Sequence, residues 1–172
     1  MATLFSIGHG TRPVGELISM LGDVEVERLV DVRSAPGSRR NPQFSRGDLA
    51  ATLAGAGIAY VWRKDLGGWR RARADSPNTA LRSSAFRGYA DYMLTDEFEQ
   101  GLRWLVDTSR EARTAFMCAE TLWWRCHRRM ISDALAARGI EVIHLIRPGK
   151  AEPHRLSDEA RPIDGRLVYD VG

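Results

Sequence analysis

A short stretch in the last third of the chain, Phe116–Arg129, contains two cysteines, a carboxylate, a histidine and three arginines. An apolar run that predicts a strand precedes it, and a helical pattern follows. Ligands of open α/β sheets bind at the carboxyl ends of the strands, and the free N–H groups at a helix start attract anions. The stretch therefore indicates a site, with the candidate residues Cys118, Glu120, Cys126, His127 and Arg128.

Two kinds of chemistry suit this stretch. In an anion site, the helix start at Cys126-His127-Arg128 would bind a phosphate together with arginines from other loops, and Glu120 would act as a general base. In a thiol site, a cysteine at a helix start near arginines would have a lowered pKa and would act as a nucleophile. The structural alternatives are a buried thiol for Cys118 and an ion pair with a nearby arginine for Glu120.

A metal site would use Cys118, Cys126, His127 and His9. The spacing Cys-x7-Cys-His lacks the close cysteine pair of common zinc sites. We therefore assign no metal ligand and expect no cofactor.

Further candidates lie where the first two predicted strands end. A Gly8-His9-Gly10 turn follows the strand predicted at residues 3–7, and His9 is either a catalytic group or a structural histidine. Arg33 lies near the carboxyl end of the strand predicted at residues 28–33, where a charge needs a partner or a site. It is therefore either an anion ligand or the partner of Asp31.

Two loops bring polar groups toward the same predicted sheet edge. The loop over residues 34–44 contains Ser38, Arg39 and Arg40, for which solvated surface charge is the alternative. The long loop over residues 63–84 contains glycines that permit close approach and Trp69, which offers a stacking face. We expect residues 71–78 of this loop to be solvated and mobile.

Helical patterns alternate with the predicted strands, one of them beginning at Phe86 and containing Arg87 and Tyr89. Those two side chains would face a ligand, or Tyr89 would belong to the core with a wet edge. The alternation predicts an α/β fold, a single three-layer domain with a mostly parallel sheet and helices on both faces. About five strands are expected, at 3–7, 28–33, 58–62, 112–118 and 141–146.

The composition limits the possible classes of protein. The 172 residues predict one domain over 1–172, in which 147–172 form an irregular extension with a short edge strand at 167–169. A net charge of +3 is too small to imply nucleic-acid binding by itself. Two cysteines and an amino terminus unlike a signal peptide argue against a disulfide framework. No apolar run is long enough to span a bilayer, so we expect a cytoplasmic protein without a membrane partner.

Several motifs, in order, resemble the bacterial and archaeal family called domain of unknown function 488. The resemblance covers residues 4–146 and includes a five-residue gap between Glu120 and Cys126, whereas Trp69 is less typical of the family. It implies an α/β fold and a common site, but no particular reaction. The motifs are Ile7-Gly8-His9, Asp31-Val32-Arg33-Ser34, Ser38-Arg39, Leu66-Gly67-Gly68, Phe86-Arg87-Gly88-Tyr89-Ala90, Met117-Cys118-Ala119-Glu120 and Cys126-His127-Arg128.

These observations favour an enzyme, a hydrolase or transferase, that acts on a phosphate-bearing substrate such as a nucleotide or nucleic acid. Glu120, His127, His9 and Cys126 are the expected catalytic residues. The alternatives are a non-catalytic nucleic-acid-binding module and, more weakly, a thiol-redox or metal-binding protein. The expected substrate-binding residues are Arg33, Ser34, Ser38, Arg39, Gly67, Gly68, Arg87, Tyr89, Cys118 and Arg128.

Overall fold

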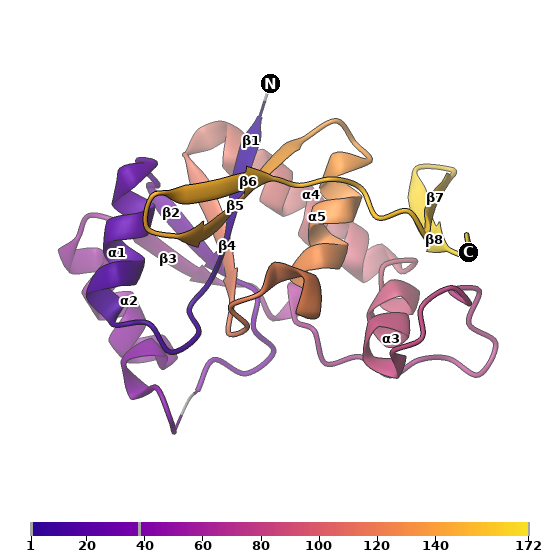
Figure 1. The fold of residues 1–172 in the computed structure, drawn as a ribbon, viewed down its shortest axis with the longest axis horizontal. Coiled ribbons are helices and arrows are strands. Elements are labelled where there is room, and N and C mark those ends of the chain that lie inside the picture. Colours follow the sequence, from indigo (N-terminus) through magenta and orange to yellow (C-terminus); the bar gives the residue numbers. More distant parts are fainter. Residues whose placement is uncertain (1, 38, 172) are drawn as a thin grey trace.

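A six-stranded sheet in the order β3-β2-β4-β1-β5-β6 forms the centre of the computed structural model, which describes residues 2–37 and 39–171 (Figure 1). The first five strands are parallel, as the sequence predicts, and β6 is antiparallel to β5. The strands are β1 (Thr3–Gly8), β2 (Arg28–Asp31), β3 (Ala59–Trp62), β4 (Thr114–Cys118), β5 (Glu141–Arg147) and β6 (Lys150–Pro153).

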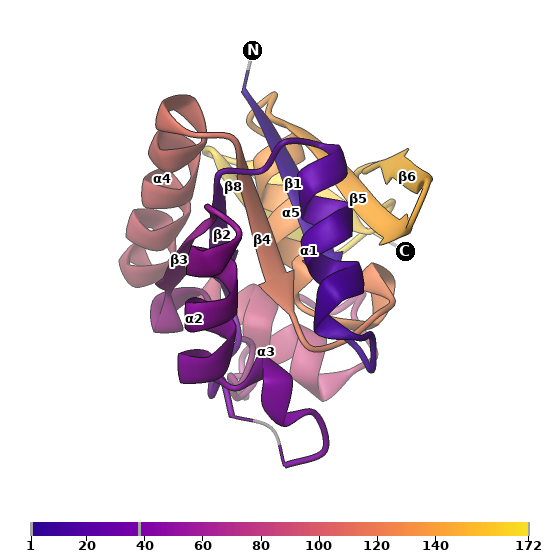
Figure 2. The same cartoon turned by 90° about the vertical axis from the view of Figure 1, so that its left-hand side faces the viewer.

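Five α-helices cover both faces of the sheet (Figures 1 and 2). Side chains of β1 alternate between the two cores: Leu4 packs with α3, α4 and α5, whereas Phe5 and Ile7 pack with α1 and α2. The predicted three-layer α/β fold is confirmed. The helices are α1 (Val14–Asp23), α2 (Arg46–Gly55), α3 (Ser84–Tyr92), α4 (Asp96–Glu111) and α5 (Arg128–Ala136), with 3₁₀ turns η1 (Pro42–Phe44), η2 (Lys64–Leu66) and η3 (Trp123–Arg125).

The neighbouring strands β1 and β4 lead to helices on opposite faces of the sheet. The chain leaves β1 for α1 on one face and leaves β4 for α5 on the other. Such a switch point opens a crevice at the carboxyl ends of the strands. Hydrogen bonds from His9 N to Cys118 O (3.0 Å) and from Gly10 N to Ala119 O (2.9 Å) hold the two loops together there.

The carboxyl-terminal extension is ordered into strands, so the expectation of an irregular segment over 147–172 is wrong. Besides β6, it forms a hairpin of β7 (Ala160–Ile163) and β8 (Arg166–Tyr169). The strand expected at 167–169 exists, but it belongs to this separate hairpin. Leu167 and Tyr169 are buried in the core beside α3, α4 and α5, which accounts for its position.

The segment at 71–78 is exposed at Arg71, Arg73, Asp75 and Pro77, as expected, but hydrogen bonds also anchor it to α3. Asp91 on α3 accepts hydrogen bonds from Ser76 Oγ (2.5 Å), Asn78 Nδ2 (2.7 Å) and the backbone N–H of Arg73 (2.8 Å). Asn78 is fully buried and accepts a hydrogen bond from the N–H of Tyr169. A carboxylate distant in sequence thus anchors the loop.

Among the described residues, no helix is both long and apolar enough to cross a membrane.

Candidate functional site

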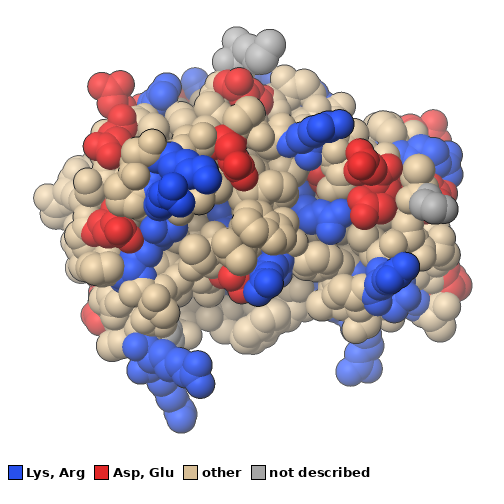
Figure 3. Space-filling view, in the orientation of Figure 1, with Lys and Arg blue, Asp and Glu red and all other residues tan. Residues whose placement is uncertain are grey.

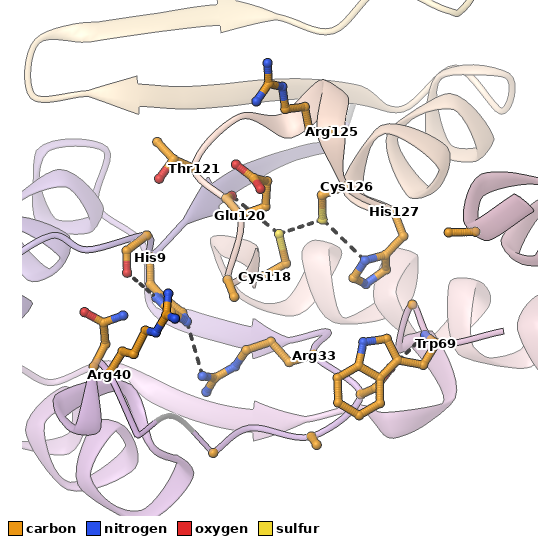
Figure 4. Close-up of a pocket in the computed structure, with 18 of the residues that line it drawn as sticks. His9, Arg33, Arg40, Trp69, Cys118, Glu120, Thr121, Arg125, Cys126 and His127 are labelled. Carbon is orange, nitrogen blue, oxygen red and sulfur yellow. Dashed lines mark hydrogen bonds between the residues drawn. The ribbon is translucent and has the colours of Figure 1, made fainter. Parts of the chain in front are cut away.

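A pocket of about 830 Å³ opens at the carboxyl ends of β1, β2 and β4. Most of the residues predicted for the site line it: His9, Arg33, Ser34, Arg39, Gly68, Tyr89, Cys118, Glu120, Cys126 and His127. Gly67, Arg87 and Arg128 lie outside its lining, and Ser38 lies outside the described residues. The structure adds lining residues that the prediction omitted, among them Arg40, Phe86, Thr121 and Arg125 (Figure 4).

The two cysteines lie at the centre of this pocket, with their sulfur atoms 2.7 Å apart (Figure 4). Cys126 is 8% exposed and Cys118 is 2% exposed. Burial raises the pKa of the Cys118 thiol well above its ordinary value. Burial also opposes ionisation of Cys126, but the contact with the Cys118 thiol and the Arg128 cation lower its pKa below the ordinary value. Cys126 is therefore the more acidic of the two thiols.

His127 lies beside Cys126 as a neutral imidazole. Its Nε2 is 2.8 Å from the Val32 carbonyl oxygen, which can only accept, so Nε2 carries the proton. Its Nδ1, 3.3 Å from Cys126 Sγ, is then free to accept one. Burial lowers the pKa of His127 and keeps the ring neutral. Gly68 makes this placement possible, because a Cβ there would lie 2.6 Å from Nδ1.

Arg128 is a buried cation whose contacts point to an anionic sulfur. It is 1% exposed, and within residues 2–37 and 39–171 it forms no salt bridge with a carboxylate. Its guanidinium donates to Cys118 Sγ (3.0 Å), Ser6 Oγ (3.0 Å) and Glu120 O (2.7 Å). A buried charge requires compensation, and the cysteine pair is the acidic group that Arg128 contacts. Arg128 therefore supports the site from beneath the pocket.

Arg33 is paired with Asp31. Of the two roles considered for Arg33, anion ligand or partner of Asp31, the second describes most of its contacts. Its Nε and Nη2 donate to the Asp31 carboxylate, at 2.7 Å for the shortest contact, and its Nη1 lies 3.3 Å from His9 Nε2. His9 also stacks on Phe44 and donates from Nδ1 to the Gly10 carbonyl. Burial, together with the Arg33 cation, lowers the pKa of His9. Both ring nitrogens are thus occupied in the pocket wall.

Two further arginines lie at the rim of the pocket. Arg40 extends from its loop toward His9, and Arg125 lies on the opposite side above the sulfur atoms (Figure 4). Trp69 is 80% exposed on a loop held by the hydrogen bond from its N–H to Ser34 Oγ. Glu120 is exposed at the mouth and accepts a hydrogen bond from Leu122 N at 3.2 Å.

Comparison with protein families agrees with this arrangement of motifs. Residues 13–135 match the family described as "Domain of unknown function DUF488", which is well over half of the chain. The chain belongs to the DUF488 family. Searches of curated proteins and of solved structures found no match.

A buried polar chain lies partly beyond the DUF488 match and was missed by the sequence analysis. Ser6 Oγ is 2.5 Å from His144 Nδ1, His144 Nε2 is 2.9 Å from His154 Nδ1, and His154 Nε2 is 2.7 Å from Asp133. Asp133 accepts, so every proton in the chain points toward it, starting from Arg128, which donates to Ser6. The sequence does hold one indication of this chain, because Ser6 and His144 are polar residues inside apolar strand patterns, where a buried polar group needs a partner.

No group of three or more His, Cys, Asp or Glu residues in the described part of the DUF488 chain is arranged to hold a metal ion. The lining offers thiol, imidazole and guanidinium groups instead. The site can therefore supply an acidic thiol and a proton acceptor at its centre and cations at its rim.

Proposed function

We propose that this protein is an enzyme that acts on a small phosphate-bearing substrate of the nucleotide class, with Cys126 as its nucleophile. The observation that carries the proposal is a cysteine of lowered pKa, 3.3 Å from His127 Nδ1, at the centre of a pocket whose rim bears arginines. An anionic sulfur in the pocket serves covalent catalysis, and the arginines supply the affinity for an anion.

The groups around Cys126 suit both steps of covalent catalysis, which are the attack of the thiolate on the substrate and the release of the covalent intermediate. The Arg128 N–H lies 3.4 Å from Cys126 Sγ at the start of α5, where the helix dipole favours a negative charge. The thiolate would attack an electrophilic atom of the substrate, and His127 Nδ1 would accept or return a proton. Glu120, at the mouth, would activate water or a second substrate to release the covalent intermediate. This sequence describes a hydrolase or a transferase.

The rim would provide recognition. Arg39, Arg40 and Arg125 would bind the phosphate, whereas Arg33 is already held by Asp31. Trp69 presents an exposed ring to a base, a contact worth about 1–3 kcal/mol for aromatic stacking. Tyr89 is fully buried and packs its ring against His127, so it would position the imidazole.

A non-catalytic nucleic-acid-binding module fits less well. On the face shown in Figure 3, Lys and Arg side chains lie in separate groups with Asp and Glu between them. Polynucleotide binding relies on an extended basic surface and does not need a buried thiolate. The confined pocket therefore favours a small substrate.

Thermal unfolding of the reduced protein in the presence of nucleotides, sugar phosphates, inorganic phosphate and polynucleotides tests this proposal. A ligand that binds only the folded state raises the melting temperature with concentration. We expect stabilisation by a nucleotide, its loss in Arg40→Gln, and its retention in Arg110→Gln, which changes an exposed arginine of α4 outside the pocket. Stabilisation by polynucleotides alone, abolished by salt, would contradict the enzyme and support the binding module.

A further inference from the structure

We propose that Cys126 and Cys118 form a redox-active pair, in which a hydroperoxide oxidises Cys126 and Cys118 then closes a reversible disulfide with it. The inference does not require a phosphate-bearing substrate, so it stands apart from the proposed function. It makes the centre of the pocket a site of oxidative modification.

The geometry assigns different roles to the two sulfur atoms. Both cysteines line the pocket, but Cys126 is 8% exposed and Cys118 only 2%, so an oxidant entering the pocket meets Cys126 first. The sulfur atoms are 2.7 Å apart, compared with about 2.05 Å in a disulfide bond. A movement of less than about 1 Å therefore brings them to bonding distance. A resolving thiol beside an accessible thiolate is the arrangement of reversible redox sensors.

The chemistry is balanced in two steps. The Cys126 thiolate attacks the terminal oxygen of the hydroperoxide, the O–O bond breaks, and the products are a sulfenic acid and an alkoxide or hydroxide ion. The Cys118 sulfur then attacks the sulfenic sulfur, the S–O bond breaks, and the departing hydroxide leaves as water with the proton from Cys118. A small dithiol reductant reverses the reaction by thiol–disulfide exchange.

Oxidation would change the charge of the site as well as its bonding. The disulfide cannot ionise, so the buried Arg128 cation loses the acidic thiol pair beside it. Arg128 also donates to the carbonyl oxygens of Glu120 and Thr121. These hydrogen bonds hold the loop between the two cysteines in place. The oxidised state would therefore lack the nucleophile and would have a rearranged loop at the mouth of the pocket.

The chain offers a clean test because Cys118 and Cys126 are its two cysteines. The reduced protein is treated with a tenfold excess of hydrogen peroxide, and its mass and thiol content are then measured. We expect the loss of two hydrogens, about 2 Da, with no covalent dimer on a non-reducing gel and full recovery of both thiols with dithiothreitol. Tryptic mapping should show residues 118 and 126 joined.

Two variants separate the roles. Cys118→Ser should accumulate a sulfinic acid at Cys126, about 32 Da heavier, because no resolving thiol is present. Cys126→Ser should leave Cys118 reduced over the same period. If wild type keeps two titratable thiols, or gains oxygen at Cys126 without forming the disulfide, the redox pair is contradicted. Nucleotide stabilisation of the reduced protein is measured separately, so either proposal can fail without the other.

Discussion

Arg128 sets the electrostatics of the site at the scale of single residues. A guanidinium stays protonated at all working pH values, so burying it without a carboxylate demands another anion. The Cys118 sulfur accepts from its Nε, and Cys126 Sγ accepts from its backbone N–H. These contacts favour negative charge on the cysteine pair and lower the pKa of Cys126 although it is buried.

Replacing this cation should therefore suppress the thiolate. In Arg128→Met we expect the pKa of Cys126 to rise and the thiolate fraction near neutral pH to fall, because the cation that lowers this pKa is removed. The rate of alkylation by iodoacetamide at pH 7 measures it. Arg129→Met is the matched control, because Arg129 on the same helix donates to Ser157 and Glu159 instead. Equal rates in wild type and Arg128→Met would refute this role for Arg128.

The central fold could be predicted at the scale of elements because its strands follow simple patterns. Buried parallel strands are short apolar runs, and the glycines, prolines and caps between them indicate turns and helix starts. Thr95, for example, accepts the N–H of Phe98 at the start of α4. The extension was harder, because β6 is an exposed edge strand that ends in a proline.

Candidate site residues could likewise be located, but their partners could not. Parallel strands end at a common edge, which correctly brought His9, Arg33 and Cys118 together. The pairing of Arg33 with Asp31 was left open, and the anchoring of the 71–78 segment by Asp91 depends on a contact distant in sequence. Such contacts leave no periodic signal in the chain.

The loop after η2 positions His127 from the opposite wall of the pocket. A methyl group in Gly68→Ala would meet the imidazole at under 3 Å and displace it from Cys126. We expect a several-fold lower alkylation rate of Cys126 and a less stable protein, by roughly 1–3 kcal/mol for overpacking. Gly47→Ala in α2 is the control, since nothing lies within 4 Å of the added carbon. Unchanged thiol reactivity in Gly68→Ala would show that the ring is not coupled to Cys126.

At the scale of the whole molecule, the buried polar chain, a series of hydrogen bonds from Arg128 to Asp133, connects several elements of the fold. This chain joins β1, β5, the segment after β6 and α5 through hydrogen bonds among Ser6, His144 and His154. Trp123 stacks on His144 at a ring separation of 4.2 Å, which links the chain to the loop between the two cysteines. The extension beyond the family match thus contributes to the support of the pocket.

This chain makes the stability of the whole protein depend on pH. Burial, with the charges of His154 and Arg128, lowers the pKa of His144 to about 2, so the folded protein keeps it neutral where the unfolded chain, with a pKa near 6.5, is protonated. The unfolded state therefore binds the extra proton, and the free energy of unfolding falls as pH drops below about 6.5. One group contributes up to about 1.4 kcal/mol per pH unit there.

Urea unfolding between pH 7 and pH 4 checks this dependence. In His144→Gln, which removes the titrating group, we expect a less stable protein at pH 7 and a slope shallower by about one proton. Thr3→Ala, a change at an exposed hydrogen bond of the same strand pair, should keep the wild-type slope. Parallel curves for wild type and His144→Gln would mean that His144 does not set this dependence.

The most direct test of the central claim is the pH dependence of iodoacetamide alkylation at each cysteine of the reduced protein, followed by peptide mass spectrometry. We expect Cys126 to react first, with a midpoint below the value of about 8.5 of an ordinary thiol, and Cys118 to stay unmodified. A nucleotide that stabilises the fold should slow the reaction. A midpoint at or above about 8.5, or alkylation of Cys118 before Cys126, would contradict a thiolate nucleophile at the centre of the pocket.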